Sequence, residues 1–332
     1  MNNFTYTRAT SLKDAVQRAT SDKNSLFIGG GTNVVDRLKA FLDEPSQLID
    51  ISRLQMQSIE RMTNGWRVGA LVTNTALADH PEIRRNYPFL SRAILSGASQ
   101  QIRNVATVGG NILQRTRCSY YYDTAFACNK RKPGSGCPAA TGINRMHAIL
   151  GASEECVAVH PSDMCVALAA LDAVVEVEGP KGKRQIPFVN FHRLPENTPQ
   201  KDSNLEAGEL ITAIILPPLS WAKSGVYLKL RDRTSYSFAL ISVAAALEVA
   251  GDKIKDVRLA MGGVAHKPWR ANEAEKFLIG KPADITTFTQ AANIALQGAK
   301  PLAHNGYKID MTKRAIRRAL MVSAQGGGIV EL

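Results

Sequence analysis

The sequence predicts an α+β protein of two domains, and three observations carry this prediction. The chain has 332 residues, too many for one typical domain and enough to bury a core without disulfide bonds. Short apolar runs typical of strands alternate with runs at helical spacing over the first hundred residues. The stretch PPLSWAKS, at 217–224, interrupts the pattern and predicts a linker.

The first hundred residues are predicted to form strands and helices in alternation. Ser11 is a suitable N-cap for a helix that begins at residue 12. Val34, Leu38 and Phe41 recur at helical spacing, which predicts a second helix. The expected strands cover 4–6, 25–28, 47–51, 58–62 and 66–70, and the expected helices cover 12–19, 32–41, 73–80 and 89–98.

Residues 101–160 break this alternation with a stretch rich in Gly, Pro, Asn and Ser. A loop of this length inside a compact domain is usually functional or disordered, and its cysteines favour function. Beyond it we expect a helix at 163–173, strands at 173–179, 209–217, 226–230, 238–249 and 256–264, and helices to the end. The predicted domains are 1–217, with a cysteine-rich loop at 114–158, and 225–325.

Composition and charge exclude several classes of protein. An apolar fraction of 45% with 21% charged residues is typical of a globular protein, and no apolar run reaches the roughly 18 residues of a membrane span. The net charge of +12 suits an anionic partner, but no aromatic base-stacking motif or helix-turn-helix accompanies the basic groups, so nucleic-acid binding is not expected. The N-terminus resembles no export signal, which predicts the cytoplasm unless a signal-bearing partner carries the folded chain out.

Four of the five cysteines form a candidate metal site. Cys165 lies in the apolar helix and is expected to be a buried hydrophobe. The other four follow the spacing C-x9-C-x8-C-x18-C and are Cys118, Cys128, Cys137 and Cys156. Because no tight C-x2-4-C pair is present, the spacing favours a bulky 4Fe-4S cluster over a zinc ion, with unligated thiols as the third possibility.

Basic residues adjoin this motif. Lys130, Arg131 and Lys132 follow Cys128 directly and would offset the negative charge of the thiolates. His147 and His160 lie near Cys156 in sequence, but a lone loop histidine is more often a hydrogen-bonding residue, and neither is assigned as a ligand.

Two glycine loops are candidate phosphate-binding segments. FIGGGTNVVD, at 27–36, follows a predicted strand and opens a predicted helix, so its backbone N–H groups and helix N-terminus suit an anion. It is not the G-x-G-x-x-G motif, and a glycine turn alone is weak evidence. NVATVGGNI, at 104–112, repeats the design, and two such loops suit the two phosphates of one dinucleotide.

Five motifs occur in order along nearly the whole chain: FIGGGTN, QIRNVATVGGN, HPSDM leading to LAALDA, YLKLRDR and GGVAHKPWRANEAE. Together they resemble the FAD-binding subunit of the molybdenum hydroxylases, the family of xanthine dehydrogenase and aldehyde oxidoreductase. The inserted cysteine loop resembles the FAD subunit of bacterial heterotrimeric aldehyde oxidoreductases, which carries an additional 4Fe-4S cluster there.

The resemblance implies a set of cofactor-binding residues, and it implies the four cysteines as cluster ligands. Lys229 matches a lysine beside the flavin, where a cation favours the anionic reduced form. Asp163 matches a carboxylate that contacts FAD, although it also suits the first turn of a helix. The implied FAD-binding residues are Leu26, Phe27, Ile28, Gly29, Gly30, Gly31, Thr32, Asn33, Val34, Gly97, Ala98, Thr107, Gly110, Asn111, Asp163, Leu210, Ile211 and Lys229.

The implied fold is a two-part FAD domain of the vanillyl-alcohol-oxidase (PCMH) type, followed by a C-terminal α+β domain with a short antiparallel sheet and helices. The implied function is electron transfer from an iron–sulfur subunit through FAD to an outside acceptor, such as ferredoxin or oxygen, with aldehyde oxidation on a partner molybdenum subunit. Molybdopterin and 2Fe-2S clusters belong to those partners, and no catalytic acid or base is assigned to this chain. Export with a signal-bearing partner would place it in the periplasm.

Three other functions remain open at this point. The chain would also suit the FAD subunit of a molybdenum hydroxylase that acts on purines or aromatic rings. A stand-alone flavin reductase of the same fold is the second possibility, but it gives no reason for the cysteine loop. A zinc-stabilised nucleotide-binding scaffold without redox activity is the third.

Overall fold

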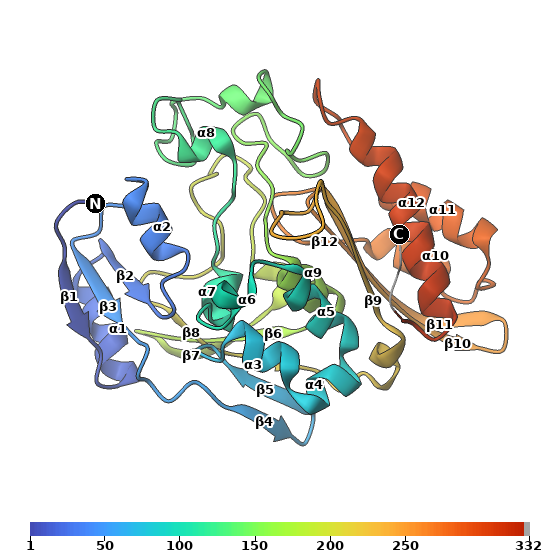
Figure 1. Ribbon diagram of the computed structural model, residues 1–332, viewed down its shortest axis with the longest axis horizontal. Helices are drawn as coiled ribbons and strands as arrows, with labels where there is room; N and C mark the ends of the chain where they lie inside the picture. The colour runs from blue at the N-terminus through green and yellow to red at the C-terminus, as the bar shows by residue number, and fades with distance from the viewer. Residues whose placement is uncertain (329–332) are drawn as a thin grey trace.

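A computed structural model describes residues 1–328, in which three β-sheets follow one another along the chain (Figure 1). The first sheet is parallel, with the strand order β1-β3-β2, and packs against α1. Ser11 caps α1, because its Oγ accepts from the Asp14 amide at 3.1 Å. The elements of this part are β1 (Thr5–Arg8), α1 (Leu12–Ser21), β2 (Ser25–Ile28), α2 (Val34–Lys39) and β3 (Gln47–Asp50).

The second sheet is antiparallel and has the order β4-β5-β8-β6-β7. Its strands are β4 (Ile59–Met62), β5 (Gly65–Gly69), β6 (Val174–Gly179), β7 (Gly182–Pro187) and β8 (Leu210–Leu216). The central strand β8 is almost continuously buried, as its apolar run predicts. The helices of this part are α3 (Asn74–Asp79), α4 (Pro81–Asn86), α5 (Pro88–Ser96) and α9 (Asp163–Ala170).

The third sheet is antiparallel, with the order β12-β11-β10-β9, and α12 packs along β10. Its elements are β9 (Val226–Leu230), β10 (Ile241–Ala250), β11 (Lys253–Gly262), β12 (Trp269–Arg270), α10 (Asn272–Leu278), α11 (Ile285–Ala295) and α12 (Tyr307–Ala324). Every residue of α9 is buried, because this helix contacts α5 on one side and β10 and β11 on another. The α+β prediction, with an antiparallel sheet and helices in the C-terminal part, is confirmed.

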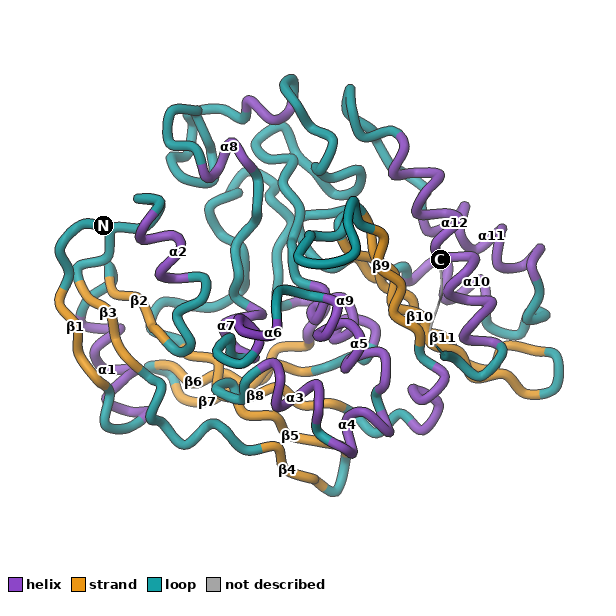
Figure 2. The backbone as a smooth tube through the Cα atoms, in the orientation of Figure 1, coloured by secondary structure: helices purple, strands orange, loops and turns teal. Residues whose placement is uncertain are grey.

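The segment between α5 and α9 is mainly loop, and it forms most of the teal region at the top of Figure 2. Four short helical turns punctuate it: α6 (Gln100–Arg103), α7 (Val108–Ile112), α8 (Ser119–Tyr122) and the 3-10 turn η1 (Pro138–Ala140). The Tyr121 and Ile149 side chains are each only 1% exposed. Ile149 lies in the hydrophobic core of the third sheet and its helices, so the long loop is packed against the rest of the protein.

Some elements differ from the sequence prediction for local physical reasons. The helix α4 was not predicted, because Pro81 and Pro88 each occupy the first position of a separate helix and divide one helical region into three. The strand β7 was also missed, since Ile186 is its only buried residue. The expected linker contains a 3-10 turn, η3 (Ser220–Ser224), and a further 3-10 turn, η2 (Phe188–Asn190), follows β7.

Across residues 1–328, none of the helices combines the length and the apolar character that crossing a membrane requires.

Lys308, in the first turn of α12, fastens the end of the cysteine-rich loop to the third sheet. Its side chain is fully buried, and its ammonium group donates to the carbonyl oxygens of Met146 at 2.9 Å, His147 at 3.1 Å and Gly263 at 2.8 Å. Three acceptors match the three protons of the ammonium group. The contact therefore holds together segments that lie more than one hundred residues apart.

Lys308→Met is expected to lower the free energy of unfolding by about 3 kcal/mol, because three buried carbonyl groups lose their donor while the apolar stem is kept. Chemical denaturation of the full chain measures this loss. Lys313→Met is the matched control on the same helix, since its side chain is only partly buried, and it should change stability by less than about 0.5 kcal/mol. Equal stability of the two variants would contradict this role of Lys308.

Candidate functional site

The two glycine loops lie against each other at the mouth of a cleft. A Cβ atom added to Gly30 would lie 2.0 Å from the carbonyl oxygen of Val105, a distance that no side chain tolerates. Gly31 has φ of +74°, the left-handed region that glycine adopts without strain. The missing side chain at Gly30 therefore allows the backbones of the two loops to meet, and Gly31 allows the first loop to turn.

The first loop offers free backbone donors. Within residues 1–328, the amide groups of Gly30, Gly31, Thr32 and Asn33 donate to no other group of the protein. Successive unpaired N–H groups form a concave site that suits phosphate oxygens. The Nδ2 of Asn33 is also buried without an acceptor, and Asn33 lines the cleft.

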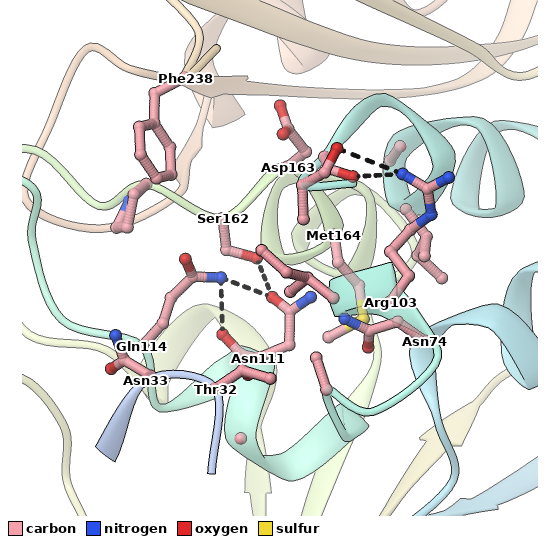
Figure 3. A pocket seen from close by; sticks show the side chains of 18 of the residues that line it. Thr32, Asn33, Asn74, Arg103, Asn111, Gln114, Ser162, Asp163, Met164 and Phe238 are labelled. Carbon is pink, nitrogen blue, oxygen red and sulfur yellow. Dashed lines mark hydrogen bonds between the residues drawn. The ribbon is translucent and has the colours of Figure 1, made fainter. Parts of the chain in front are cut away.

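The second loop forms the opposite wall (Figure 3). The Thr107 Oγ1 accepts from the Gly110 amide at 3.2 Å and so caps α7. The Oδ1 of Asn111 accepts from Ser162 Oγ at 2.6 Å and from Gln114 Nε2 at 2.8 Å. This network connects the second loop to the N-terminus of α9.

A buried ion pair forms part of the wall of the cleft. Asp163 begins α9, and Lys229 lies in β9 of the third sheet. The Lys229 Nζ donates to Asp163 Oδ2 at 2.8 Å and to the carbonyl of Ser96 at 2.9 Å, while the Tyr227 hydroxyl donates to Asp163 Oδ1 at 2.6 Å. The side chains of Asp163 and Lys229 are 7% and 4% exposed. Lys229 is thus not an exposed strand residue.

The turn at Gly97 and Ala98 is shaped by its neighbours. A Cβ atom on Gly97 would lie 3.2 Å from Asp163 Oδ2, and Ala98 has φ of +53°. The Arg103 Nη1 donates to the Gly97 carbonyl at 2.7 Å and to those of Leu95 and Ala98 at 3.3 Å. Arg103 therefore holds this turn against the cleft.

The cleft has a volume of about 370 Å³, and it brings together many of the predicted residues. Those that line it are Thr32, Asn33, Gly97, Ala98, Gly110, Asn111, Asp163 and Lys229. A second cavity, of about 580 Å³, shares Arg117, Asp163 and Phe238 with the cleft.

Other predicted residues lie behind these walls. Thr107 shapes its loop, and Leu210 and Ile211 are buried in β8, away from the cleft surface. Seven predicted residues of the first loop and its flanks do not line the cleft: Leu26, Phe27, Ile28, Gly29, Gly30, Gly31 and Val34.

The sequence analysis missed several residues of the cleft. Asn74, Arg103, Gln114, Arg117, Ser162 and Phe238 all line it. Among residues 1–328, the Oδ1 of Asn74 and the Nε of Arg103 are buried and have no hydrogen-bond partner. Arg103 lies in the motif QIRNVATVGGN, so the sequence offered a signal for it. Asn74 and Phe238 lie far from both glycine loops in sequence and reach the cleft only in the folded chain.

Cys118, Cys128, Cys137 and Cys156 line one small pocket of the cysteine-rich loop, although they are spread over 39 residues of sequence. All four are free thiols. No three of their sulfur atoms lie within 4.8 Å of one another, whereas the sulfurs around a single zinc ion are about 3.8 Å apart. The arrangement is wider than a zinc site.

Burial governs the thiols of this pocket. It raises the pKa of Cys118 to about 11 and that of Cys156 to about 12, and the charge of Lys130 opposes the shift at Cys156. The Nε2 of His147 lies 3.1 Å from Cys118 Sγ, and burial lowers the pKa of His147 to about 4. His147 is therefore a neutral neighbour of the cysteine pocket that sequence reasoning did not assign.

The three basic residues after Cys128 have different environments. Lys130 lines the cysteine pocket and is buried. Arg131 donates to the backbone carbonyls of Tyr120 and Tyr121, among others, and so clamps the loop between Cys118 and Cys128. Lys132 is exposed. Only Lys130 is placed to act on the thiols directly.

Cys165 is fully buried in α9, and burial raises the pKa of its thiol to about 12. Its sulfur lies within 4.8 Å of a ring nitrogen of His160 and of His192. The Ser162 amide donates to His160 Nδ1 at 3.3 Å. Because Nδ1 accepts this proton, neutral His160 carries its own proton at Nε2. Neither ring nitrogen then offers a free lone pair, which disfavours His160 as a metal ligand.

Family comparisons assign both halves of the chain. Residues 2–219 match the FAD binding domain in molybdopterin dehydrogenase, and residues 226–322 match the CO dehydrogenase flavoprotein C-terminal domain. An aldehyde oxidoreductase FAD-binding subunit of Escherichia coli is 47% identical over 96% of this chain and 98% of its own length. A glyceraldehyde dehydrogenase medium chain of Sulfolobus acidocaldarius is 30% identical over 91% of each.

Solved structures share the fold. Carbon monoxide dehydrogenase from Hydrogenophaga pseudoflava contains a chain that superimposes with a TM-score of 0.77 at 22% identity, covering 98% of this chain and 99% of that one. The chain described here belongs to the family of FAD-binding oxidoreductase subunits of the molybdenum hydroxylases.

Proposed function

We propose that this chain is the electron-transfer subunit of a molybdenum-containing aldehyde oxidoreductase, with FAD bound between the two glycine loops. The observation that carries the proposal is the row of unpaired amides at Gly30–Asn33, of which Thr32 and Asn33 line the cleft together with Gly110 and Asn111 of the second loop. Such donors suit the pyrophosphate of a dinucleotide. The 47% identity to an aldehyde oxidoreductase subunit favours aldehydes over purines or aromatic rings as the substrate of the complex.

Each wall of the cleft has a separate role in this proposal. The amides of the first loop, with the free Nδ2 of Asn33, bind the pyrophosphate, and Asn111 fixes the opposite wall. Bound FAD supplies the redox chemistry, since a flavin passes electrons on singly or in pairs. Asp163 orients the Lys229 side chain, whose ammonium group lies near the Gly97 turn. Its positive charge favours the anionic form of the reduced flavin ring.

Gly30→Ala is expected to weaken FAD binding at least about tenfold, because the added methyl group collides with the Val105 carbonyl and moves one glycine loop away from the other. The FAD content of the purified chain and titration of the flavin-free protein measure the change. Gly306→Ala is the matched control, since its Cβ would come no closer than 3.8 Å to another atom. Unchanged FAD affinity in Gly30→Ala would show that the loops do not form the binding site.

We further propose that the four cysteines of the loop hold a 4Fe-4S cluster. Three observations support it: one pocket gathers all four thiols, their separation exceeds that of a zinc site, and buried Lys130 adjoins the pocket. Four thiols around one pocket are the donor set that a 4Fe-4S cluster uses, and this supports the proposal. Cys118 also borders the cavity that adjoins the FAD cleft, which supports a relay between the cluster and the flavin, while a clasp that orders the loop is the alternative role.

Cys128→Ser is expected to remove about four iron and four sulfide ions per chain from anaerobically purified protein. The control is Cys165→Ser, which changes a buried cysteine outside the pocket and should keep the metal content of the wild type. Elemental analysis with acid-labile sulfide determination distinguishes the outcomes. Zinc in place of iron, or equal iron content in both variants, would contradict the assignment.

The remaining partners follow from this role. We propose that a molybdopterin-containing large subunit and a small subunit with 2Fe-2S clusters complete a heterotrimer, and that ferredoxin or oxygen accepts the electrons. We also propose export to the periplasm in complex with a signal-bearing partner, with the cytoplasm as the alternative. The assignment of the domains to 1–217 and 225–325 is part of the same proposal.

A further inference from the structure

A buried lysine lies beside the cysteine pocket within a fixed set of partners. The Lys130 side chain is 1% exposed, and its Nζ donates to the Pro199 carbonyl at 2.6 Å and to Asp202 Oδ1 at 2.5 Å. The third neighbour is His266, whose Nε2 lies 2.7 Å from the same Nζ. Each proton of the ammonium group thus has an acceptor.

His266 is arranged to accept this third proton. Its Nδ1 lies 2.9 Å from the carbonyl of Arg193, so it donates there and leaves Nε2 as an acceptor. Burial, with the charge of Lys130 adding to it, lowers the pKa of His266 to about 4. Neutral His266 therefore adds no charge of its own beside Lys130.

Asp202 lies between two cations. Its Oδ1 accepts from Lys130 Nζ, and its Oδ2 accepts from Arg115 Nε at 2.6 Å. Burial alone would raise the pKa of Asp202, but Arg115 and Lys130 hold it well below its usual range. The carboxylate is therefore ionised, and it anchors the lysine while cancelling part of the positive potential.

Lys130 is the member of this set that lines the pocket, together with the four cysteines. Glu155 also lines the pocket, and its carboxylate accepts from Asn129 Nδ2 at 2.6 Å. A cluster on four thiolates carries net negative charge that grows on reduction. A buried cation beside it therefore stabilises the reduced form, because the low dielectric strengthens the interaction.

We propose that the charge of Lys130 raises the reduction potential of the cluster. Asp202 positions the lysine and, through its own negative charge, reduces this effect. The inference rests on the proposed 4Fe-4S cluster. It assigns to Lys130 alone the role that the sequence suggested for three consecutive basic residues, since Arg131 binds backbone carbonyls and Lys132 faces solvent.

The test is a redox titration of the full chain, followed by the electron paramagnetic resonance signal of the reduced cluster. Lys130→Met should shift the midpoint potential downward, because a positive charge is lost. Asp202→Asn should shift it upward, since a negative charge is lost while the amide oxygen still accepts from Lys130. Lys132→Met, an exposed neighbour, should leave the potential unchanged.

Iron and sulfide content separates this inference from the proposed function. A wild-type chain without cluster iron refutes the proposed cluster, and with it this inference. A loaded wild-type chain in which Lys130→Met and Asp202→Asn keep the same midpoint potential overturns the inference alone. If Lys130→Met does not assemble, Asp202→Asn decides: an upward shift supports the proposal, and no shift or a downward shift overturns it.

Discussion

The close contact between two backbones, Gly30 against the carbonyl of Val105, is the constraint on which the rest of the site depends. Glycine is needed there because a Cβ would occupy the position of the carbonyl oxygen. The contact brings the loop after β2 against the segment before α7, so that Thr32 and Asn33 line the same cleft as Asn111. The cleft proposed to bind FAD thus depends on the absence of a side chain at Gly30 as much as on the side chains that line it.

Two buried lysine contacts attach the C-terminal part to this cleft and to the cysteine-rich loop. The Asp163–Lys229 pair joins α9 to β9, and Lys308 joins α12 to the end of the loop. Removing one partner of a buried pair leaves an uncompensated charge or polar group, which costs far more than a surface pair. The C-terminal part is therefore attached both to the cleft and to the end of the cysteine-rich loop.

The sequence predicted those features that depend on local pattern. The apolar strand β8, the largely apolar helix α9 and the two glycine loops each carry their signal in neighbouring residues. Features that arise from long-range contact were missed: Asn74 and Phe238 enter the cleft from other elements, and His147 approaches Cys118 across 29 positions. The spacing of the cysteines indicated a shared site, but their common pocket required the fold of the whole loop.

The central claim is that FAD binds through the unpaired backbone amides of the first glycine loop. Hydrogen–deuterium exchange of the full chain, with the flavin removed and then restored, tests this claim most directly. The account predicts rapid exchange of the amides at 30–33 in the flavin-free chain and marked protection when FAD is added, because phosphate oxygens then accept from them. Protection elsewhere with no change at 30–33 would contradict it.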